Sequence, residues 1–307
     1  MARFIAWRLL RAVLTVLCVA LFVAIALRIS GDPAVIALGP DAPAAALQAF
    51  RAQNGLNLPI PMQIARQFLA MLHGNFGVSM MDGTQALPLV LRHVIPTLEI
   101  AVPALLLKLA LGIPAGLLAA VRQNSWIDRL VMAGAALGLA VPNFVIGVLL
   151  VIVFAVKLGW LPSSGQPSFA GLLLPVISLG LAGAGVLARF TRSAIVGVLT
   201  QPHVRAASAK GLSRSAVLLR HVLPNAVATL LPVIGLAIGG LLAGTVVVET
   251  LFSWPGLGNL LVVAVANRDV PVVECILILS AATMALSNLV MDVAHAWRDP
   301  RIVRGRG

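Results

Sequence analysis

Charged side chains are scarce in this sequence. Asp, Glu, Lys and Arg make up only 10% of its 307 residues, whereas 60% of the residues are hydrophobic. A soluble domain carries about 25% charged residues, and a chain of this length cannot bury so much apolar surface in one core. The composition therefore excludes an ordinary soluble protein and indicates that lipid surrounds most of the chain.

Cysteine is nearly absent and tyrosine is missing altogether. The two cysteines, Cys18 and Cys275, both lie in apolar runs, and the sequence has no CxxC pair or Cys/His cluster. Such a pattern predicts neither a disulfide framework nor a metal site. We expect both cysteines to be small, buried hydrophobic side chains.

Catalytic motifs are missing too. The sequence contains no HExxH, GxSxG or GxxxxGK(S/T), which are patterns of zinc hydrolases, serine hydrolases and P-loop ATPases. We therefore expect a chain with no catalytic, cofactor-binding or metal-binding residues that does not itself hydrolyse ATP. The histidines are scattered through predicted loops, at His73, His93, His203, His221 and His295.

Long apolar runs are abundant instead. A helix needs about 20 apolar residues to cross a bilayer, and we predict an all-α membrane protein with six such helices. The first run lacks a small-residue cleavage site after its apolar part, so we expect it to be retained rather than removed as a signal peptide. The predicted spans are 9–29, 95–121, 130–156, 171–199, 227–249 and 271–293.

Basic residues are unevenly divided between the two sides of these spans. Positive charge is favoured on the cytoplasmic side, so the side that is richer in Lys and Arg, which holds both termini, is predicted to be cytoplasmic. The net charge of +12 then needs no nucleic-acid partner. The richer side has Arg3, Arg8, Arg11, Arg122, Arg129, Arg189, Arg192, Arg205, Lys210, Arg214, Arg220, Arg298, Arg301, Arg304 and Arg306, and the other side has Arg28, Arg51, Arg66, Arg92, Lys157 and Arg268.

Three segments are predicted on the outer side, at 30–94, 157–169 and 250–270. The last contains FSWPGLGNLL, which is apolar but includes Pro255 and Gly256 and so cannot form a plain spanning helix. Irregular backbone near lipid must be shielded by protein. We therefore predict a re-entrant or surface-lying element there.

Small residues recur within the spans. GxxxG pairs let two helices approach closely in lipid, so they predict a tightly packed bundle or a dimer interface. Prolines near the span ends predict kinks. The glycine pairs are Gly112/Gly116, Gly134/Gly138, Gly235/Gly239 and Gly240/Gly244, and the prolines are Pro103, Pro114, Pro142, Pro175 and Pro232.

Polar side chains inside the spans are candidates for a translocation path, because a charge at mid-bilayer costs about 2.5–3.5 kcal/mol. Glu99 and Lys108 share one span but are nine residues apart, so they point to opposite faces. Lys108 needs a partner or an aqueous cavity, and structural or inter-subunit pairing is the alternative to lining a path. Glu99 and Glu249 lie near span ends, where they can also reach the headgroups. The candidate path residues are Glu99, Lys108, Asn143 and Glu249.

The stretch RAASAKGLSRSAVLLRHVLPNA, residues 205–226, is basic and rich in alanine within an apolar chain. Alanines favour a short helix over Arg205–Lys210, and Gly211 is a natural C-terminal stop. Ser213 can cap a second helix that Pro224 would end. Two short helices on the cytoplasmic face, with small side chains, predict docking into a partner's groove; the alternative is a lipid-binding interfacial helix.

This stretch also resembles a known motif. AKGLSRSAVLLRHVLPNA is similar to the cytoplasmic EAA loop of ABC-importer permeases, and HVRAASAKGL resembles the YVRTARAKGL of the dipeptide/oligopeptide/nickel permease family. Further resemblances to this family follow along nearly the whole chain. They are LRISGDPA (Leu27–Ala34), GLNLPIPMQ (Gly55–Gln63), LHGNFGVS (Leu72–Ser79), FSWPGLGNLL (Phe252–Leu261), RDVPVV (Arg268–Val273) and DPRI (Asp299–Ile302).

The resemblance implies an ABC type I importer permease fold in a bacterial inner membrane. The implied partners are a homologous second permease, two ABC ATPase subunits that bind ATP and Mg²⁺, an extracytoplasmic binding protein, a peptide substrate and membrane lipid. The implied regions are 1–29, an extracytoplasmic segment 30–94, a core 95–293 with a coupling loop 200–226, and a tail 294–307. The implied ATPase-coupling residues are Arg205, Ala206, Ala207, Lys210, Gly211, Ser213, His221, Pro224 and Asn225, and the outer-gate or binding-protein contacts are Trp254, Pro255, Gly256 and Asp269.

Some positions depart from the family pattern. His203, Ala206 and Ser208 replace a usual Tyr, Thr and Arg, and Arg205 stands where other importer families have Glu. The charge pairing of the loop therefore cannot be carried over. Short peptides are the expected cargo, with nickel or haem as alternatives in the same family. An ATP-independent channel or secondary transporter is the alternative from another class.

Overall fold

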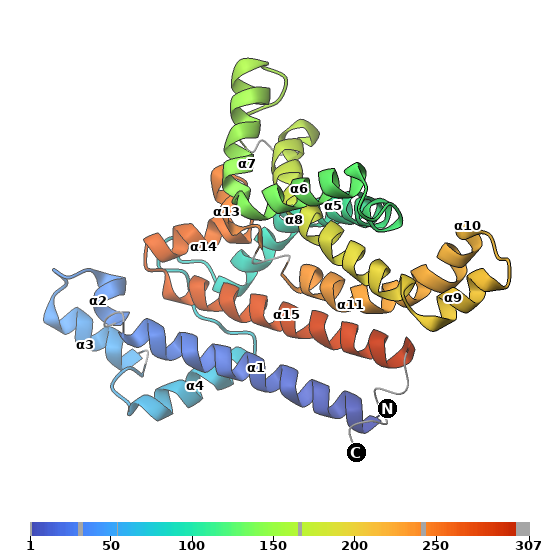
Figure 1. Ribbon diagram of the computed structural model, residues 1–307. Coiled ribbons are helices and arrows are strands. Elements are labelled where there is room, and N and C mark those ends of the chain that lie inside the picture. The colour runs from blue at the N-terminus through green and yellow to red at the C-terminus, as the bar shows by residue number, and fades with distance from the viewer. Residues whose placement is uncertain (1, 30–32, 54, 165–167, 241–243, 299–307) are drawn as a thin grey trace.

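The structure is a computed structural model that describes residues 2–29, 33–53, 55–164, 168–240 and 244–298. These residues are almost entirely helical (Figure 1). The DPRI motif and Arg301, Arg304 and Arg306 lie outside the described residues. The elements are α1 (Ala2–Ile29), α2 (Pro33–Leu38), α3 (Ala44–Gln53), α4 (Ile60–Leu72), α5 (Ala86–Val121), α6 (Trp126–Ala140), α7 (Asn143–Leu150), η1 (Val151–Lys157), α8 (Phe169–Leu199), α9 (Pro202–Ala209), α10 (Arg214–Val217), η2 (Leu218–Val222), α11 (Leu223–Gly239), α13 (Val246–Leu251), α14 (Leu257–Ala266) and α15 (Val270–Arg298).

Long apolar helices dominate the fold. Within the described residues, five helices are long and apolar enough to cross a membrane, or six if one bent pair is counted as a single span. The predicted all-α membrane architecture is confirmed. The spans are Ala6–Ala26, Ala86–Val121, Phe169–Leu199, Arg214–Gly239 and Val270–Val293, with Trp126–Ala140 and Asn143–Lys157 as the bent pair.

The third predicted span is not one straight helix. Its two halves meet at an angle of 99° between Ala140 and Asn143. Val141 is extended (φ −92°, ψ 118°) because the residue before a proline avoids the helical region. Pro142 then starts the new direction, with no N–H to continue the ladder. The kink predicted at Pro142 is therefore confirmed, and it divides the predicted span 130–156 into two helices.

The fifth span also differs from its prediction. It runs over Arg214–Gly239 rather than 227–249, and Pro224 does not end the helix that Ser213 begins. A π-helical turn, η2, lies just before Pro224. Its wider turn accommodates the proline ring, which in a regular α-helix clashes with the carbonyl group four residues earlier. Glu249 consequently lies in the separate short helix α13.

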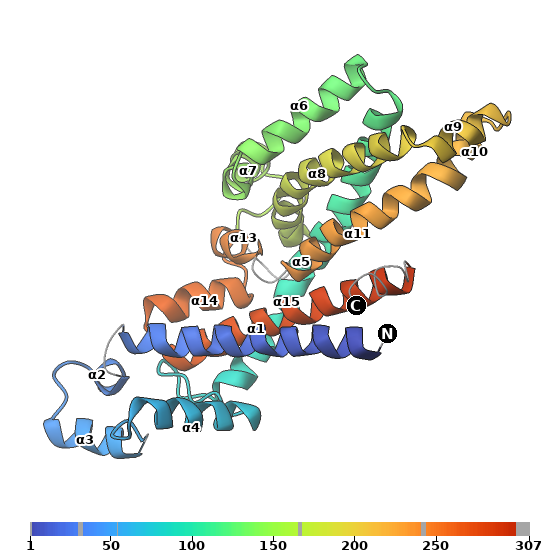
Figure 2. The same ribbon diagram turned by 60° about the horizontal axis from the view of Figure 1, so that its bottom comes forward.

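Among the described helices, α5 and α8 are the most closely packed pair (Figure 2). A Cβ atom on Gly112 would lie 2.8 Å from the carbonyl oxygen of Ala184, and Gly116 lies equally tightly against Ala188 and Thr191. The two helices therefore run in the same direction with their backbones nearly in contact. The packing role predicted for this GxxxG pair is confirmed.

The other predicted glycine pairs behave differently. Gly235 and Gly239 pack on α15, against Met291 and Met284 respectively. A Cβ atom on Gly134 or Gly244 would meet nothing within 4 Å, so close packing by these positions within the described part of the chain is not observed. Two of the four pairs thus build the bundle of this chain.

Helix α1 lies along α15 in both ribbon views (Figures 1 and 2). An ion pair joins the two helices, with Arg8 Nη1 2.7 Å from Asp292 Oδ2. Cys18 on α1 is exposed, so the prediction that it is buried was wrong, whereas Cys275 on α15 is buried. An apolar side chain is stable on a lipid-facing surface, and this explains the exposed position of Cys18.

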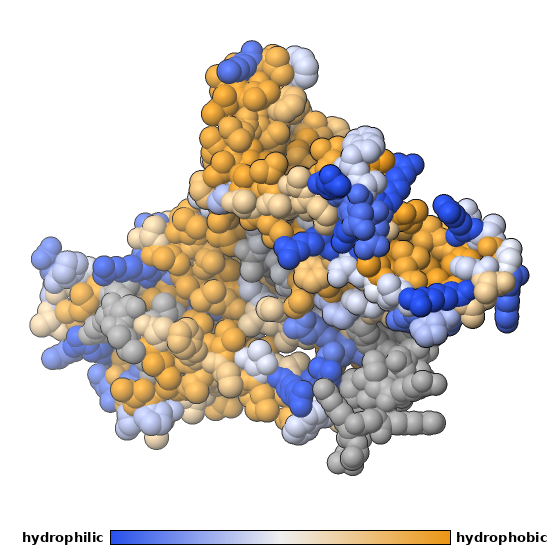
Figure 3. All heavy atoms as spheres, viewed as in Figure 1, coloured by the Kyte–Doolittle hydropathy of each residue, from blue (hydrophilic) through white to orange (hydrophobic). Residues whose placement is uncertain are grey.

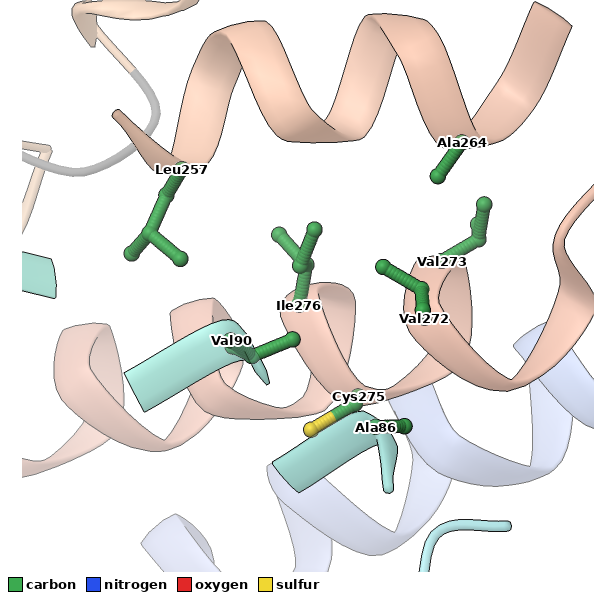
Figure 4. Packing of buried hydrophobic residues seen from close by; sticks show 8 residues of the cluster. All are labelled: Ala86, Val90, Leu257, Ala264, Val272, Val273, Cys275 and Ile276. Carbon is green, nitrogen blue, oxygen red and sulfur yellow. The ribbon is translucent and has the colours of Figure 1, made fainter. Parts of the chain in front are cut away.

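A hydrophobic cluster joins helix α14 to the beginnings of α5 and α15 (Figure 4). Leu257 and Ala264 of α14 point toward Ile276, Val272 and Val273 of α15. The predicted FSWPGLGNLL element is therefore packed onto the bundle. The face of the molecule seen in Figure 3 is largely hydrophobic, with hydrophilic patches toward helix ends. The cluster consists of Ala86, Val90, Leu257, Ala264, Val272, Val273, Cys275 and Ile276.

Candidate functional site

The predicted coupling loop forms two short helices, α9 and α10, which follow the C-terminal end of α8 and precede η2 and α11 (Figure 1). Helix α9 ends at Ala209, and Gly211 follows with φ +81°. The Ser213 hydroxyl accepts a hydrogen bond from the backbone N–H of Ala216, at 3.3 Å, and so caps α10. The local structure predicted for this stretch is confirmed as far as Ser213.

One face of α9 is anchored in the bundle. Val204 and Ala207 are buried against Ile195 and Val198 at the end of α8. Val217, Val222 and Ala226 of the following helix complete this cluster. The orientation of α9 is therefore fixed by apolar contacts with both of its neighbouring helices.

The opposite face of α9 is open. Arg205, Ala206 and Lys210 are exposed, and so is Gly211, where an added Cβ would meet nothing within 4 Å. Ala207 differs from the other predicted coupling residues, because it belongs to the buried face. The exposed side thus combines positive charge with small side chains, which leaves room for a partner's surface.

A polar link closes the base of the loop. Asn225 donates from Nδ2 to the carbonyl oxygen of His221 at 2.7 Å, and the same nitrogen lies 3.5 Å from His203 Nε2. Pro224 is exposed beside it. The side chains that the sequence placed at both ends of the loop are therefore brought together.

A clamp that the sequence analysis missed holds the α5–α6 turn against α8. Arg192 donates from Nε to Asp128 Oδ1 at 2.5 Å and from Nη2 to Oδ2 at 2.7 Å. Asp128 is 3% exposed and also accepts from the N–H of Asn124 at 2.8 Å. Such a bidentate pair fixes orientation as well as contact, so it locks α6 to the helix that leads into the coupling loop.

The turn at residues 249–259 is built around a buried carboxylate. Glu249 has 0% exposure, and its Oε2 accepts from the backbone N–H groups of Gly258 at 2.6 Å and Asn259 at 3.1 Å. These N–H groups belong to the first turn of α14, where negative charge is favoured. Gly256 and Gly258 leave no room for a Cβ beside this carboxylate.

The same turn is fastened to α5. Thr97 Oγ1 accepts from the N–H of Leu257 at 2.7 Å, and Trp254 donates from Nε1 to the carbonyl oxygen of Pro96 at 2.8 Å. Trp254 is 1% exposed, whereas Pro255 is exposed. Among the predicted outer-gate residues, Pro255 is thus the one whose side chain is accessible in this conformation.

Two carboxylates near the start of α15 hold the 33–85 region. Asp269, also buried, accepts from the Ser79 hydroxyl at 2.5 Å, and Glu274 accepts from Gln67 Nε2 at 2.6 Å. Ser79 lies in a short turn, where Asp82 accepts hydrogen bonds from the N–H and hydroxyl of Thr84 that lower the pKa of Asp82. Asp269 therefore fastens this turn to α15.

The four predicted path residues are not brought together. Glu99 is exposed on α5, Lys108 is partly buried against α8, Asn143 begins α7, and Glu249 is buried in α13. No hydrogen bond or ion pair joins any two of them in the described part of the chain. A path formed by these residues stays a prediction.

Known proteins identify the family. Residues 112–304 match the family described as the binding-protein-dependent transport system inner membrane component. The chain belongs to this family. The glutathione transport system permease protein GsiC of Salmonella paratyphi A (strain ATCC 9150 / SARB42) is 40% identical over 303 residues, covering 98% of this chain and 99% of the relative. GsiC of Escherichia coli (strain K12) is 41% identical over 272 residues, covering 89% of each chain.

A solved structure shares the fold of this permease. A chain of the MetNI methionine ABC transporter, in an inward-facing conformation, matches with a TM-score of 0.58 at 19% identity, covering 68% of this chain and 96% of that chain. The permease is thus a multi-pass inner-membrane subunit of an ABC importer. The resemblance to importer permeases of the dipeptide/oligopeptide/nickel type is confirmed.

Proposed function

We propose that this chain is one permease subunit of an ATP-driven importer for short peptides. It alternates between inward-facing and outward-facing states, and ATP and Mg²⁺ are bound on partner ATPase subunits. The observation that carries the proposal is the geometry of α9. Its buried face is anchored to α8, while its exposed face offers Arg205, Ala206 and Lys210 to a partner.

An anchored helix of this kind can transmit force. Val204 and Ala207 connect α9 to α8, and α8 packs along α5 through Gly112 and Gly116. A displacement of α9 by an ATPase subunit is therefore passed to the two most closely packed helices of the bundle. A lipid-binding helix would instead present a broad apolar face, and the open face of α9 is basic and small.

The remaining partners follow from the family. We propose a homologous second permease subunit, two ABC ATPase subunits and an extracytoplasmic binding protein. The distribution of Lys and Arg supports cytoplasmic termini and a cytoplasmic α9. On this orientation the 30–94 segment and the 249–259 turn face the binding protein, and Pro255 is the accessible tip of the turn.

Peptide cargo is supported by the relatives. Those at about 40% identity over nearly the full chain are named as glutathione transport permeases, and glutathione is itself a short peptide. The extracytoplasmic binding protein of the proposed importer tests the cargo directly. Calorimetry should show heat of binding with di- and tripeptides; a protein that binds only Ni²⁺ or only haem would overturn the peptide assignment.

Gly211→Val tests the coupling assignment. A β-branched residue is strained at φ +81°, so the variant should insert normally but lose ATP-dependent uptake and retain less ATPase on co-purification. Gly83→Val is the matched control, because Gly83 has φ +70° and equally open surroundings but lies in the outer region. ATPase retention should be unchanged in this control. Normal uptake by the Gly211 variant, or uptake without ATP, would contradict the proposal.

A further inference from the structure

Lys108 stands out among the ionisable side chains of the spans. It lies in the interior of the 36-residue helix α5, 13 residues before the helix ends at Val121. At 1.5 Å per residue this is about 20 Å from that end, too far for its four-carbon stem to reach. Its ammonium group has no hydrogen-bond or ion-pair partner among the residues that the structure describes.

The surroundings of Lys108 are shaped to hold it. A Cβ atom added to Gly183 of α8 would overlap the Lys108 side chain, with Cδ and Nζ both at 2.8 Å. One turn further along, Gly112 already touches the backbone of Ala184. Helices this close leave no space for a lysine except over a residue without a side chain. Gly183 provides that space, so the position of the lysine is built into the helix pair.

The nearest acidic residue of the same helix does not neutralise Lys108. Glu99 is nine residues away, which is about 900° of rotation, and it therefore lies on the opposite face. Glu249, the other acidic candidate for the path, accepts hydrogen bonds through Oε2 from the backbone N–H groups of Gly258 and Asn259, and it forms no ion pair with Lys108 among the described residues. Lys108 is only partly buried and remains accessible to an anion from outside this chain.

We propose that Lys108 binds a carboxylate of the transported peptide during passage through the membrane. An ammonium group offers three donors and no acceptor, and a carboxylate satisfies it through charge-assisted hydrogen bonds. Every unmodified linear peptide carries such a group at its C-terminus. The proposal rests on the proposed function, since it names the chemical group of the cargo that the permease itself recognises.

The test compares two substrates in the assembled transporter. Initial rates of ATP-dependent uptake into proteoliposomes are measured for one tripeptide as its free acid and as its C-terminal amide, at saturating binding protein and peptide. Because the binding protein is the same in every sample, a change in the acid-to-amide ratio between variants reports on the permease alone.

Lys108→Met should lower uptake of the free acid roughly tenfold, the worth of one hydrogen bond to a charged group, and should leave uptake of the amide within about twofold. Lys108→Arg keeps the charge and should keep most of the preference. Gly183→Ala retains the lysine but displaces it, and should lower the acid-to-amide ratio in the same direction as Lys108→Met. The Gly183 variant also serves if the methionine variant fails to assemble.

Results that would overturn the role of Lys108 differ from the result that would overturn the peptide function. Equal loss of acid and amide uptake in Lys108→Met and Gly183→Ala would assign Lys108 to a contact with the second permease subunit and overturn the proposal. An unchanged ratio with normal uptake would overturn it as well. If the unaltered transporter takes up neither form of the peptide with ATP, the proposed peptide function fails before Lys108 is tested.

Discussion

Replacing Glu249 with alanine is expected to destabilise the permease by roughly 3–6 kcal/mol, because two hydrogen bonds to a charged acceptor are lost and each contributes about 1.5–3 kcal/mol. The N–H groups of Gly258 and Asn259 would be left without an acceptor at the start of α14. The thermal unfolding midpoint of the detergent-purified complex is the measurement. We expect a large downward shift.

The amide variant makes the reasoning quantitative. Glu249→Gln can keep an oxygen where Oε2 accepts both N–H groups, and its NH₂ group would replace Oε1, which has no hydrogen-bond partner among the described residues. Neutral hydrogen bonds have roughly half the strength of charge-assisted ones. The loss should therefore be about half of that in the alanine variant. Glu99→Gln, at an exposed carboxylate, is the control and should leave the midpoint unchanged.

Local opening of the turn is measured separately from global unfolding. A cysteine introduced at Leu257, which is 2% exposed, in a Cys18→Ala background reports opening of the turn through its access to a thiol reagent. The Cys18→Ala variant alone gives the background labelling of Cys275, which is buried. Labelling of the introduced cysteine should accelerate in the order Glu, Gln, Ala at position 249. If Glu249→Ala neither lowers the midpoint nor speeds labelling, or if Gln and Ala behave alike, the carboxylate does not hold the N-terminus of α14 and the argument is refuted.

Two further predictions concern the bundle. Asp128→Ala leaves the Arg192 guanidinium without its bidentate partner and should lower the free energy of unfolding by about 3–5 kcal/mol. In thermal unfolding, the Asp128→Ala/Arg192→Ala double variant should lose less stability than the sum of the two single variants. Additive losses would argue against coupling between the two side chains. Gly116→Leu should prevent α5–α8 packing and abolish recovery of folded permease in size-exclusion chromatography, whereas Gly134→Leu, at a site open within this chain, should be recovered normally.

Local sequence features predicted the secondary structure around Gly211 well. Helix propensity, a glycine with positive φ and a serine N-cap act over three or four residues, and all three appear around Gly211. Proline was harder to interpret. Pro142 bends its span by 99°, while Pro224 continues through a π-helical turn. Both prolines lack an N–H, so their different outcomes depend on the adjoining backbone, which a proline alone does not specify.

Contacts between distant residues explain most of the other differences. Arg192 and Asp128 are 64 residues apart, and the N–H of Leu257 meets a threonine 160 residues earlier. Neither pair has a spacing pattern in a single sequence. Asp128 did carry one local clue, since it lies three residues after the N-cap Ser125. Its partner on α8 could be found only when the helices were placed in space.

Lys108 and Glu249, two of the candidate path residues, differ in whether the fold supplies a partner for their charge. The same rule selected both, because an ion within a membrane protein needs a partner. The Glu249 carboxylate has its partner in the first turn of α14, so its burial is accounted for by the fold. Lys108 lies in a space that Gly183 leaves for it, but its ammonium group has no partner among the described residues. On the proposed function, the energetic cost of holding this charge within the membrane is offset when the carboxylate of the transported peptide binds to Lys108.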